Sequence, residues 1–368
     1  MMKAAVITRH AITNYGSLLQ AIATEKLFET VGLECETIDY IRDDEYYTEQ
    51  EKTNLKNKPK YNSNPLTRAA YLALRQGEAV KGGRFFRDMQ KKYLHLTKRY
   101  HSLAELETDK PEADIYVTGS DQVWGKIANV DFDTAYLLSF TDDGDRRFSY
   151  ASSIGKTKLV GETADCFKHY LSRYDAVTVR ESNAKEALSE IGIAAQQVLD
   201  PTLLFGSDYW STFIEKDIEG DYILLYQLEN NKRFNDYAKK VAEKTGLRLI
   251  RVSPLRHQML RGGEFVYLPS LGELLSYIKN AKCVITDSFH ATAFSINFNT
   301  PFIDILPSGE NKCRNTSVLE LTGLTARILD NYENLSLIDE KCDFEYANTV
   351  LDAEREKSFE TVKKILEI

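Results

Sequence analysis

The apolar positions of the chain form short runs typical of buried strands, separated by stretches with apolar residues at helical spacing. Residues 3–8 read as a first strand, and residues 19–31 have the helical pattern, with Gly32 placed to end the helix. Residues 33–40 then resume an extended pattern. A strand–helix–strand unit of this kind favours a parallel sheet with helices on both faces.

The same alternation continues through the rest of the chain. Strands are expected at residues 114–118, 147–152, 176–179, 222–228, 247–252, 282–286 and 302–306. Helices are expected at residues 164–174, 183–191 (capped by Ser182), 234–244 (ended by Gly246), 271–278 (opened by a Ser270–Glu273 capping box) and 344–368. We therefore predict an N-terminal α/β domain at residues 1–205, a second at 206–340, and a C-terminal helix at 341–368 that packs back on the first domain.

A polar and basic helical insertion is predicted at about residues 42–102. Residues 42–65 have few aliphatic side chains and read as a surface excursion or mobile linker. Residues 66–102 hold nine Lys and Arg against Glu78 and Asp88, a local charge of 9 − 2 = +7, with aromatic and aliphatic residues in a helical rhythm. Two interpretations remain open: helices with a solvated basic face, or a patch for an anionic acceptor such as a lipid diphosphate at a membrane surface.

Composition narrows the class of protein. A length of 368 residues suits two domains, and a net charge of −8 argues against a general nucleic-acid binder. The five cysteines are scattered without a CxxC pair, which is typical of a reducing compartment and of neither a disulfide framework nor a zinc site. No run of 18 apolar residues is present, and the N-terminus lacks a long apolar stretch. We therefore expect a cytoplasmic protein.

The stretch from residue 281 to 304 contains the first candidate for chemistry. Its strand at 282–286 leads into Asp287 and Ser288, which offer helix caps, and His290 stands at the mouth of the following helix at 291–297. In an open α/β sheet, ligands lie beyond the carboxyl ends of the strands, where helix N-termini offer free N–H groups. A histidine there transfers a proton or holds a phosphate. The alternative is a partly buried residue at a helix start.

Other strand ends supply further candidates. Arg180 directly follows the strand at 176–179, and its guanidinium suits bidentate capture of a carboxylate or phosphate, with a local contact to Glu181 as the alternative. A binding-loop composition follows the strand at 114–118, in Ser120, Asp121, Gln122 and Trp124; the alternative is a tight turn packed by a structural tryptophan.

The loop after the first strand is the third candidate at a strand end. Asn14, Tyr15, Gly16 and Ser17 lie where a ligand would meet that strand, and their amide groups suit an anion. A plain turn is the alternative.

Six segments of the chain stand in one order and together resemble the polysaccharide pyruvyl transferase family over roughly residues 3–330. They read NYGSLLQA from Asn14, TGSDQVW from Thr118, SYASSIG from Ser149, VTVRES from Val177, VLDPTLL from Val198 and TDSFHATAFSI from Thr286. The resemblance implies two Rossmann-like domains facing a cleft, as in the GT-B glycosyltransferases. It also implies transfer of pyruvate from phosphoenolpyruvate to a sugar of a surface-polysaccharide precursor, as a cyclic ketal.

The resemblance and the chemistry together assign roles to residues. His290 is the expected proton donor to carbon 3 of phosphoenolpyruvate, and Arg180 is expected to hold the donor's carboxylate or phosphate. Many members of the family carry Arg-Leu-His where this chain has Ser288-Phe289-His290, so Ser288, with Lys312 and Arg314 from a loop at residues 307–317, completes the predicted donor site. The expected acceptor-binding residues are Asn14, Tyr15, Gly16, Ser17, Ser120, Asp121, Gln122 and Trp124.

No cofactor and no metal is expected, since the sequence shows no ligand cluster. The acceptor is expected to be a nucleotide- or lipid-linked sugar, with contact at the inner face of the membrane left open. Two other functions also remain open: a GT-B-like glycosyltransferase that uses a nucleotide sugar, and a non-catalytic sugar-binding protein of the same pathway.

Overall fold

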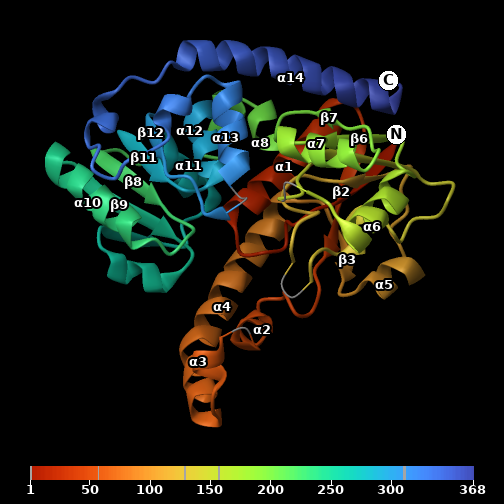
Figure 1. Cartoon of the computed structure of the whole chain (residues 1–368), viewed down its shortest axis with the longest axis horizontal. Helices are drawn as coiled ribbons and strands as arrows, with labels where there is room; N and C mark the ends of the chain where they lie inside the picture. Colours follow the sequence, from red (N-terminus) through yellow and green to blue (C-terminus); the bar gives the residue numbers. More distant parts are fainter. Residues whose placement is uncertain (1, 57, 128–129, 156–157, 310–311) are drawn as a thin grey trace. The chain divides into compact units, whose positions relative to one another are not determined.

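Two parallel β-sheets organise the chain, each within its own compact unit (Figure 1). The computed structural model describes residues 2–56, 58–127, 130–155, 158–309 and 312–368. Unit 1 comprises Met1–Pro201 together with Thr361–Ile368, and unit 2 comprises Thr202–Glu360. The parallel α/β class predicted from the sequence is confirmed in both units.

The sheet of unit 1 has seven parallel strands in the order β3-β2-β1-β4-β5-β6-β7. The strands are β1 (Lys3–Ile7), β2 (Glu34–Tyr40), β3 (Leu96–Tyr100), β4 (Ile115–Thr118), β5 (Arg146–Ser152), β6 (Ala176–Val179) and β7 (Gln196–Gln197). The chain builds outward from β1 in one direction and then returns to β4 to build in the other. The strand order therefore reverses between β1 and β4, which is where doubly wound sheets bind ligands.

The helices of unit 1 follow their strands closely. They are α1 (Tyr15–Thr30), α2 (Gln50–Lys56), α3 (Pro59–Asn62), α4 (Pro65–Tyr93), α5 (Leu103–Thr108), the 3₁₀ turn η1 (Thr134–Leu137), α6 (Gly161–Leu171) and α7 (Ser182–Glu190). Helix α1 is buried on nearly every side, and Gly32 adopts a positive φ of 88° directly after it, as a helix-ending glycine does. One apolar core joins β1, β2, β4 and β6 to α6 and α7.

The sheet of unit 2 has five parallel strands in the order β10-β9-β8-β11-β12. They are β8 (Tyr222–Tyr226), β9 (Arg248–Ser253), β10 (Glu264–Tyr267), β11 (Cys283–Thr286) and β12 (Phe302–Asp304). The order again reverses between its first strand, β8, and β11.

Helices and 3₁₀ turns surround this second sheet. They are α8 (Pro201–Leu204), α9 (Ser207–Ser211), α10 (Lys232–Thr245), η2 (Arg256–Arg261), α11 (Leu271–Lys279), α12 (Phe289–Asn297), α13 (Lys312–Leu321), η4 (Thr325–Arg327) and η5 (Ser336–Asp339).

The C-terminal helix, α14 (Phe344–Leu366), ends in unit 1 although it begins in unit 2. Arg146 on β5 donates from Nη2 to the carbonyl of Ile365 at 2.9 Å, and Gln196 on β7 donates to the Thr361 hydroxyl at 2.8 Å. The predicted packing of this helix on the first domain is confirmed.

The insertion differs from its prediction in two respects. Residues 42–65 are not a mobile linker, because α2 and α3 form there and pack against α4. Residues 96–100 are not helical; they form β3, whose Tyr100 is buried and pairs with Tyr40 of β2. Residues 96–100 have no clear apolar period, because the exposed Lys98 shares a face with Leu96 and Tyr100, and the segment forms a strand through its pairing with β2.

Three other local predictions need correction. The predicted loop at residues 307–317 gives way at Lys312 to α13, because Asn315, Val318 and Leu319 have buried positions at helical spacing. Ser182 is the first residue of α7 rather than its cap, and Glu181 occupies the cap position. Helix α6 begins at Gly161, three residues before the predicted start.

The capping box of α11 is present as predicted and gives a test of local stability. The Ser270 hydroxyl accepts from the Glu273 amide at 3.2 Å, while the Glu273 carboxylate accepts from the Ser270 amide at 2.7 Å. Ser270→Ala is expected to lower the free energy of unfolding by about 1 kcal/mol. Urea denaturation measures the loss. Ser270→Thr keeps the hydroxyl and should stay within a few tenths of a kcal/mol of the wild type, and an equal loss in both variants would contradict the capping role.

Candidate functional site at the carboxyl ends of the strands

The switch point of unit 1 brings two of the predicted segments together. Asn14 caps α1, its side-chain oxygen accepting from the amides of Gly16 at 2.8 Å and Ser17 at 3.4 Å. The Ser17 hydroxyl in turn donates to Oδ2 of Asp121 at 2.5 Å. The loop after β1 and the loop after β4 therefore meet through one buried, charge-assisted hydrogen bond.

Asp121 occupies a tightly determined turn. It has a positive φ of 74°, a conformation that aspartate tolerates better than most residues, and its own carboxylate accepts from the Gln122 amide at 2.8 Å. Two residues earlier, a Cβ added to Gly119 would lie 3.0 Å from Cβ of Thr8, so the loop packs directly on the end of β1. The geometry holds the Asp121 carboxylate at the edge of the sheet with little freedom to move.

A buried network of charged groups links the ends of β4, β5 and β6. Arg180 donates to Asp200 at 2.8 Å and to Glu181 at 3.0 Å. The Ser120 hydroxyl donates to Asp200 at 3.1 Å, and the Ser153 hydroxyl donates to Glu181 at 2.7 Å. Burial alone lowers the pKa of Arg180, but the charges of Glu181 and Asp200 outweigh that effect and leave the pKa above its ordinary value. One guanidinium and two carboxylates make a cluster with a net charge of −1.

This network bears on the predicted role of Arg180. The residue lies at the carboxyl end of β6, as expected, and the local contact with Glu181 that the sequence left as the alternative is present. Its side chain is only 3% exposed and faces two carboxylates. The positive charge of Arg180, which the sequence analysis assigned to a bound anion, is thus balanced by two carboxylates of the protein itself.

The aromatic side chains of the predicted acceptor site lie in the core. Trp124 is 1% exposed, donates from Nε1 to the carbonyl of Tyr136 and packs edge-on against Phe167. Tyr15 is equally buried and packs on Phe86 of α4. The contacts of Trp124 are those of the structural tryptophan that the sequence offered as the alternative, so the polar members of the two segments form the edge of the site.

The switch point of unit 2 is built around the turn after β11. The Asp287 carboxylate accepts from the amides of Leu228 and Glu229, at 2.7 and 2.9 Å, and so ties the end of β11 to the end of β8. Burial raises the pKa of Asp287 to about 6 despite these two hydrogen bonds. The next residue, Ser288, caps α12 by accepting from the Ala291 amide at 3.4 Å.

His290 lies in the first turn of α12, one residue inside the helix. It is 9% exposed, and its ring packs edge-on against Phe289. The structure therefore places it at a helix N-terminus beyond a strand end, as the sequence predicted, and also largely buried. Lys312 and Arg314 lie in the first turn of α13, which packs against α12; Lys312 is exposed and Arg314 half-buried.

Asp304, at the end of β12, is a second buried carboxyl group that the sequence analysis did not single out. It accepts from the Thr292 hydroxyl at 2.6 Å and from the Asn315 amide at 2.8 Å, which joins β12 to α12 and α13. Burial raises its pKa to about 7, and the nearby charge of Asp287 adds to the effect. Oδ1 of Asp304 and Oδ1 of Asn315 each lack a hydrogen-bond partner among the described residues, which a proton held on Asp304 would help to satisfy.

Unit 2 also holds a buried cation that the sequence analysis missed. Arg251 on β9 is fully buried and donates to three neutral acceptors: the side chains of Gln227 and Asn235 and the carbonyl of Gly262. Burial and the neighbouring charge of Arg261 lower the pKa of Arg251 to about 10, so it remains positive at neutral pH. The half-buried Arg261 also reaches Gln227, at 3.4 Å. The positive charges of Arg251 and Arg261 thus lie beside Gln227, the residue that follows β8.

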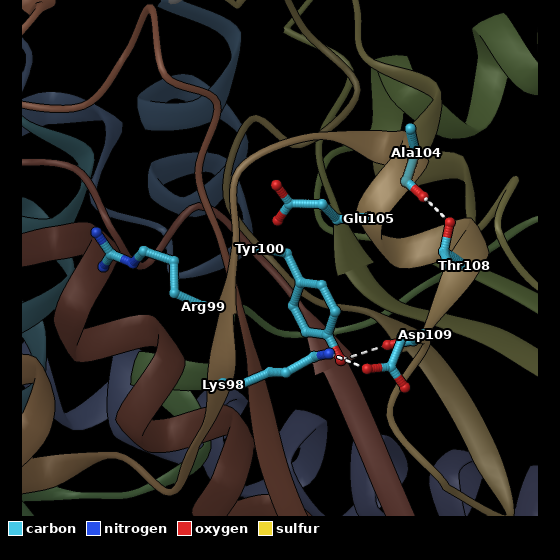
Figure 2. A pocket seen from close by; sticks show the side chains of 7 residues that line it. All are labelled: Lys98, Arg99, Tyr100, Ala104, Glu105, Thr108 and Asp109. Carbon is cyan, nitrogen blue, oxygen red and sulfur yellow. Dashed lines mark hydrogen bonds and ion pairs between the residues drawn. The ribbon is translucent and has the colours of Figure 1, made fainter.

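A surface pocket of about 410 Å³ lies elsewhere in unit 1, between β3 and α5 (Figure 2). Its polar groups bond to each other: Lys98 pairs with the carboxylate of Asp109, and the Tyr100 hydroxyl donates to the carbonyl of the same residue. Lys98 and Arg99 of the basic segment 66–102 line it, but none of the residues assigned to the donor or acceptor site does. It is not the candidate site.

Other kinds of site were sought in the part of the chain that the structure describes. No group of three or more His, Cys, Asp or Glu side chains there could hold a metal ion. No disulfide joins the cysteines of the described chain. None of the described helices combines the length and the apolar character that a membrane crossing requires.

The raised pKa of Asp304 predicts how stability depends on pH. The unfolded carboxyl ionises near pH 4, whereas the folded one keeps its proton to about pH 7, so its contribution to stability is full below pH 4 and is lost as pH rises toward 7. Asp304→Asn removes this loss and offers an amide donor toward Asn315. The wild type loses this contribution as the pH rises from 5 to 8, whereas the variant has none to lose. We therefore expect the unfolding free energy of the variant, relative to that of the wild type, to be about 2 kcal/mol higher at pH 8 than at pH 5.

Urea denaturation at the two pH values measures this difference. The exposed Asp330→Asn provides the matched control and should show no such gain. An Asp304→Asn variant whose stability follows pH as the wild type does would show that Asp304 ionises normally in the folded protein.

Comparison with known proteins gives consistent results for family and fold. The family model for polysaccharide pyruvyl transferase matches residues 14–308. No curated protein sequence matches the chain.

Three solved structures of similar fold are remote from this chain in sequence. The chain is similar to the S. aureus MnaA–UDP co-structure, with a TM-score of 0.55, 13% identity, and coverage of 100% of this chain and 97% of that one. It is also similar to UDP-GlcNAc 2-epimerase from Neisseria meningitidis bound to UDP-GlcNAc, with a TM-score of 0.54, 10% identity, and coverage of 100% and 99%. UDP-GlcNAc 2-epimerase from Methanocaldococcus jannaschii is similar as well, with a TM-score of 0.51, 14% identity, and coverage of 100% of this chain and 99% of that one.

At such low identity these structures support the fold alone, and they confirm the predicted GT-B-type class. The family match is different in kind, because it spans most of the chain, including both switch points and all of the predicted site residues except Lys312 and Arg314. Together with the two doubly wound sheets, it shows that the chain belongs to the polysaccharide pyruvyl transferase family.

Proposed function

We propose that the protein transfers pyruvate from phosphoenolpyruvate to a sugar of a surface-polysaccharide precursor, as a cyclic ketal. The observation that carries this proposal is the position of His290. In a chain whose family match covers every strand of both sheets except β1, this residue occupies the first turn of a helix that leaves the switch point of unit 2. That location suits proton transfer to a bound anionic substrate.

The reaction makes defined demands on the site. Carbon 3 of phosphoenolpyruvate gains a proton and becomes a methyl group, which leaves an oxocarbenium-like centre at carbon 2. One sugar hydroxyl attacks that centre, the C–O bond to phosphate breaks, and a second hydroxyl closes the ketal. Two hydroxyl protons are released overall: one balances the proton taken up by carbon 3 and the other leaves with phosphate. The protein must therefore donate a proton, hold two anionic groups and accept hydroxyl protons.

The donor is proposed to bind in unit 2. His290 is the proton donor, and Ser288 with the first turn of α12 faces the anionic groups. Lys312 and Arg314 on the adjacent helix supply positive charge in place of the arginine that many family members carry before the histidine. Arg251 and Arg261 add to the positive potential, because the first has only neutral acceptors and both flank Gln227.

The acceptor is proposed to meet the edge of unit 1. The Asp121 carboxylate, held by Ser17, is placed to accept a hydroxyl proton, while Asn14, Gly16, Ser120 and Gln122 supply the polar surroundings. Tyr15 and Trp124 contribute by packing beneath these groups. Similar folds bound to UDP and to UDP-GlcNAc support a nucleotide-linked sugar as acceptor, and cysteines that form no disulfide in the described chain fit a reaction in the cytoplasm.

His290→Gln tests the proposed reaction. The purified protein is offered phosphoenolpyruvate with a panel of nucleotide- and lipid-linked sugars, and phosphate release and the mass of the sugar product are followed. We expect the wild type to form a pyruvate ketal and His290→Gln to lower kcat about 10²- to 10⁴-fold. The exposed His169→Gln is the matched control and should keep wild-type activity.

Two results would contradict the proposal. Release of UDP from a nucleotide sugar, without consumption of phosphoenolpyruvate, would identify a glycosyltransferase. Full activity in His290→Gln would remove the residue from the chemistry.

The charge balance of each arginine predicts which one holds the donor. Arg261→Gln is expected to weaken phosphoenolpyruvate binding about tenfold or more, measured by isothermal titration, because it removes a half-buried cation that feels the charge of Asp287 but forms no ion pair with a described carboxylate. Arg180→Met should lower stability, since it leaves Asp200 and Glu181 buried without their cation. Loss of binding in Arg180→Met, with an unchanged melting temperature, would instead assign Arg180 to the donor as the sequence suggested.

A further inference from the structure

The insertion of unit 1 forms an ordered helical arm, defined here as α2, α3 and the N-terminal half of α4 up to Val80. Tyr71 of α4 donates to the carboxylate of Glu51 on α2 at 2.6 Å, and Gln76 donates to the carbonyl of Thr48 at 2.7 Å. Leu55 is buried beneath them. Figure 1 shows α4 leading away from the sheet of unit 1, with α2 and α3 beside its far half.

The base of α4 is anchored to the candidate site. Asp39, at the end region of β2, is fully buried and accepts two hydrogen bonds from Arg87, at 2.5 and 3.0 Å. Gln90 donates to the carbonyl of His10 at 2.9 Å, and Phe86 packs on Tyr15 at the start of α1. The arm is therefore fixed to the loop and helix that follow β1.

The outer part of the arm exposes an apolar stripe. Leu66 and Leu74 are 83% and 79% exposed, and Tyr61 just before α4 is 43% exposed. Exposed alanines fill the same helical face between the two leucines, at positions 69, 70 and 73. This spacing of i, i+3, i+4, i+7 and i+8 lines one side of a helix, and nothing in the described part of the chain covers the two leucines.

The residues between Glu51 and Glu78 carry only positive charge, although Lys52 pairs with Glu49 and Arg75 lies 3.9 Å from Glu51 and 3.7 Å from Glu78. Residues 52–75 contain six Lys and Arg and no Asp or Glu, in a chain whose net charge is −8. The six are Lys52, Lys56, Lys58, Lys60, Arg68 and Arg75. An exposed apolar stripe flanked by cations is the composition of helices that lie in a membrane interface and bind anionic lipids.

We propose that the arm docks unit 1 on an anionic membrane surface. The leucines and Tyr61 would enter the headgroup region while the cations meet lipid phosphates. A second copy of the chain fits less well, because a symmetric contact through this stripe would bring the same six cations face to face. The proposal does not depend on pyruvyl transfer, since it follows from the arm alone.

Vesicle sedimentation tests the docking. Vesicles of phosphatidylcholine, alone or mixed with phosphatidylglycerol, are spun down with the full chain at low and high salt. We expect binding to the mixed vesicles only, and weaker binding at high salt. Two variants should each lower the partition coefficient about tenfold or more: Leu66→Ser with Leu74→Ser, and Lys56→Gln with Lys60→Gln and Arg68→Gln. All five side chains are exposed, and each variant should keep the wild-type melting temperature.

A matched control removes three exposed lysines from unit 2, Lys216→Gln with Lys232→Gln and Lys341→Gln, and should bind as the wild type does. Equal losses in this control would reduce the effect to net charge and overturn the proposal. So would wild-type protein that ignores the mixed vesicles. Light scattering that shows a dimer dispersed by the leucine variant would assign the stripe to a second copy. Phosphoenolpyruvate binding should be unchanged in both arm variants, so failure of the docking and failure of the proposed reaction are separable.

Discussion

The ion pair between Arg180 and Asp200 is the interaction on which the arrangement of unit 1 most depends. Both side chains are nearly inaccessible to water, and desolvating two charges is offset only when geometry and additional hydrogen bonds are favourable. Ser120 and Glu181 supply those bonds. The pair therefore fixes the end of β6, and through Ser120 it also fixes the loop after β4. Asp121 and its contact with Ser17 of α1 follow from that loop, so the polar groups at the end of the sheet rest on a buried charge cluster.

The two units share a strand order but differ in the charge at the point where that order reverses. In unit 1, carboxylates outnumber the one cation of the buried cluster, and the serine that meets Asp121 is a hydrogen-bond donor. In unit 2, Arg251 is buried against neutral groups, while the Asp287 and Asp304 carboxyls have raised pKa values. The first environment suits a neutral, hydroxyl-bearing molecule and the second suits an anion. This division agrees with the proposal that the anionic donor binds in unit 2.

Much of the fold was predictable because its signals are local. The capping box of Ser270 and Glu273, the glycine after α1 and the short β-branched strands each specify their element within a few residues. The positions of His290 and Arg180 at strand ends followed from the same pattern. What the sequence could not give was the partner of each charged group. Asp200 lies 20 residues from Arg180, and Asn315 lies 11 from Asp304. Burial decides whether such charges are available to a ligand, and burial comes from tertiary packing. The edge strand β3 was missed for a related reason, since its identity depends on pairing with β2 rather than on its own residues.

The path of α14 has a consequence for the order in which the protein is made. Gln196 on β7 and Arg146 on β5 donate to Thr361 and Ile365, so the first unit to be translated lacks part of its own structure until the second has emerged. Domains usually fold as units during synthesis, starting from the N-terminus. Here all the strands of the first sheet lie within residues 1–201, so that sheet has its whole sequence early, but the helical residues that contact β5 and β7 are made only after unit 2. The contacts of α14 with unit 1 are therefore among the last to form during synthesis.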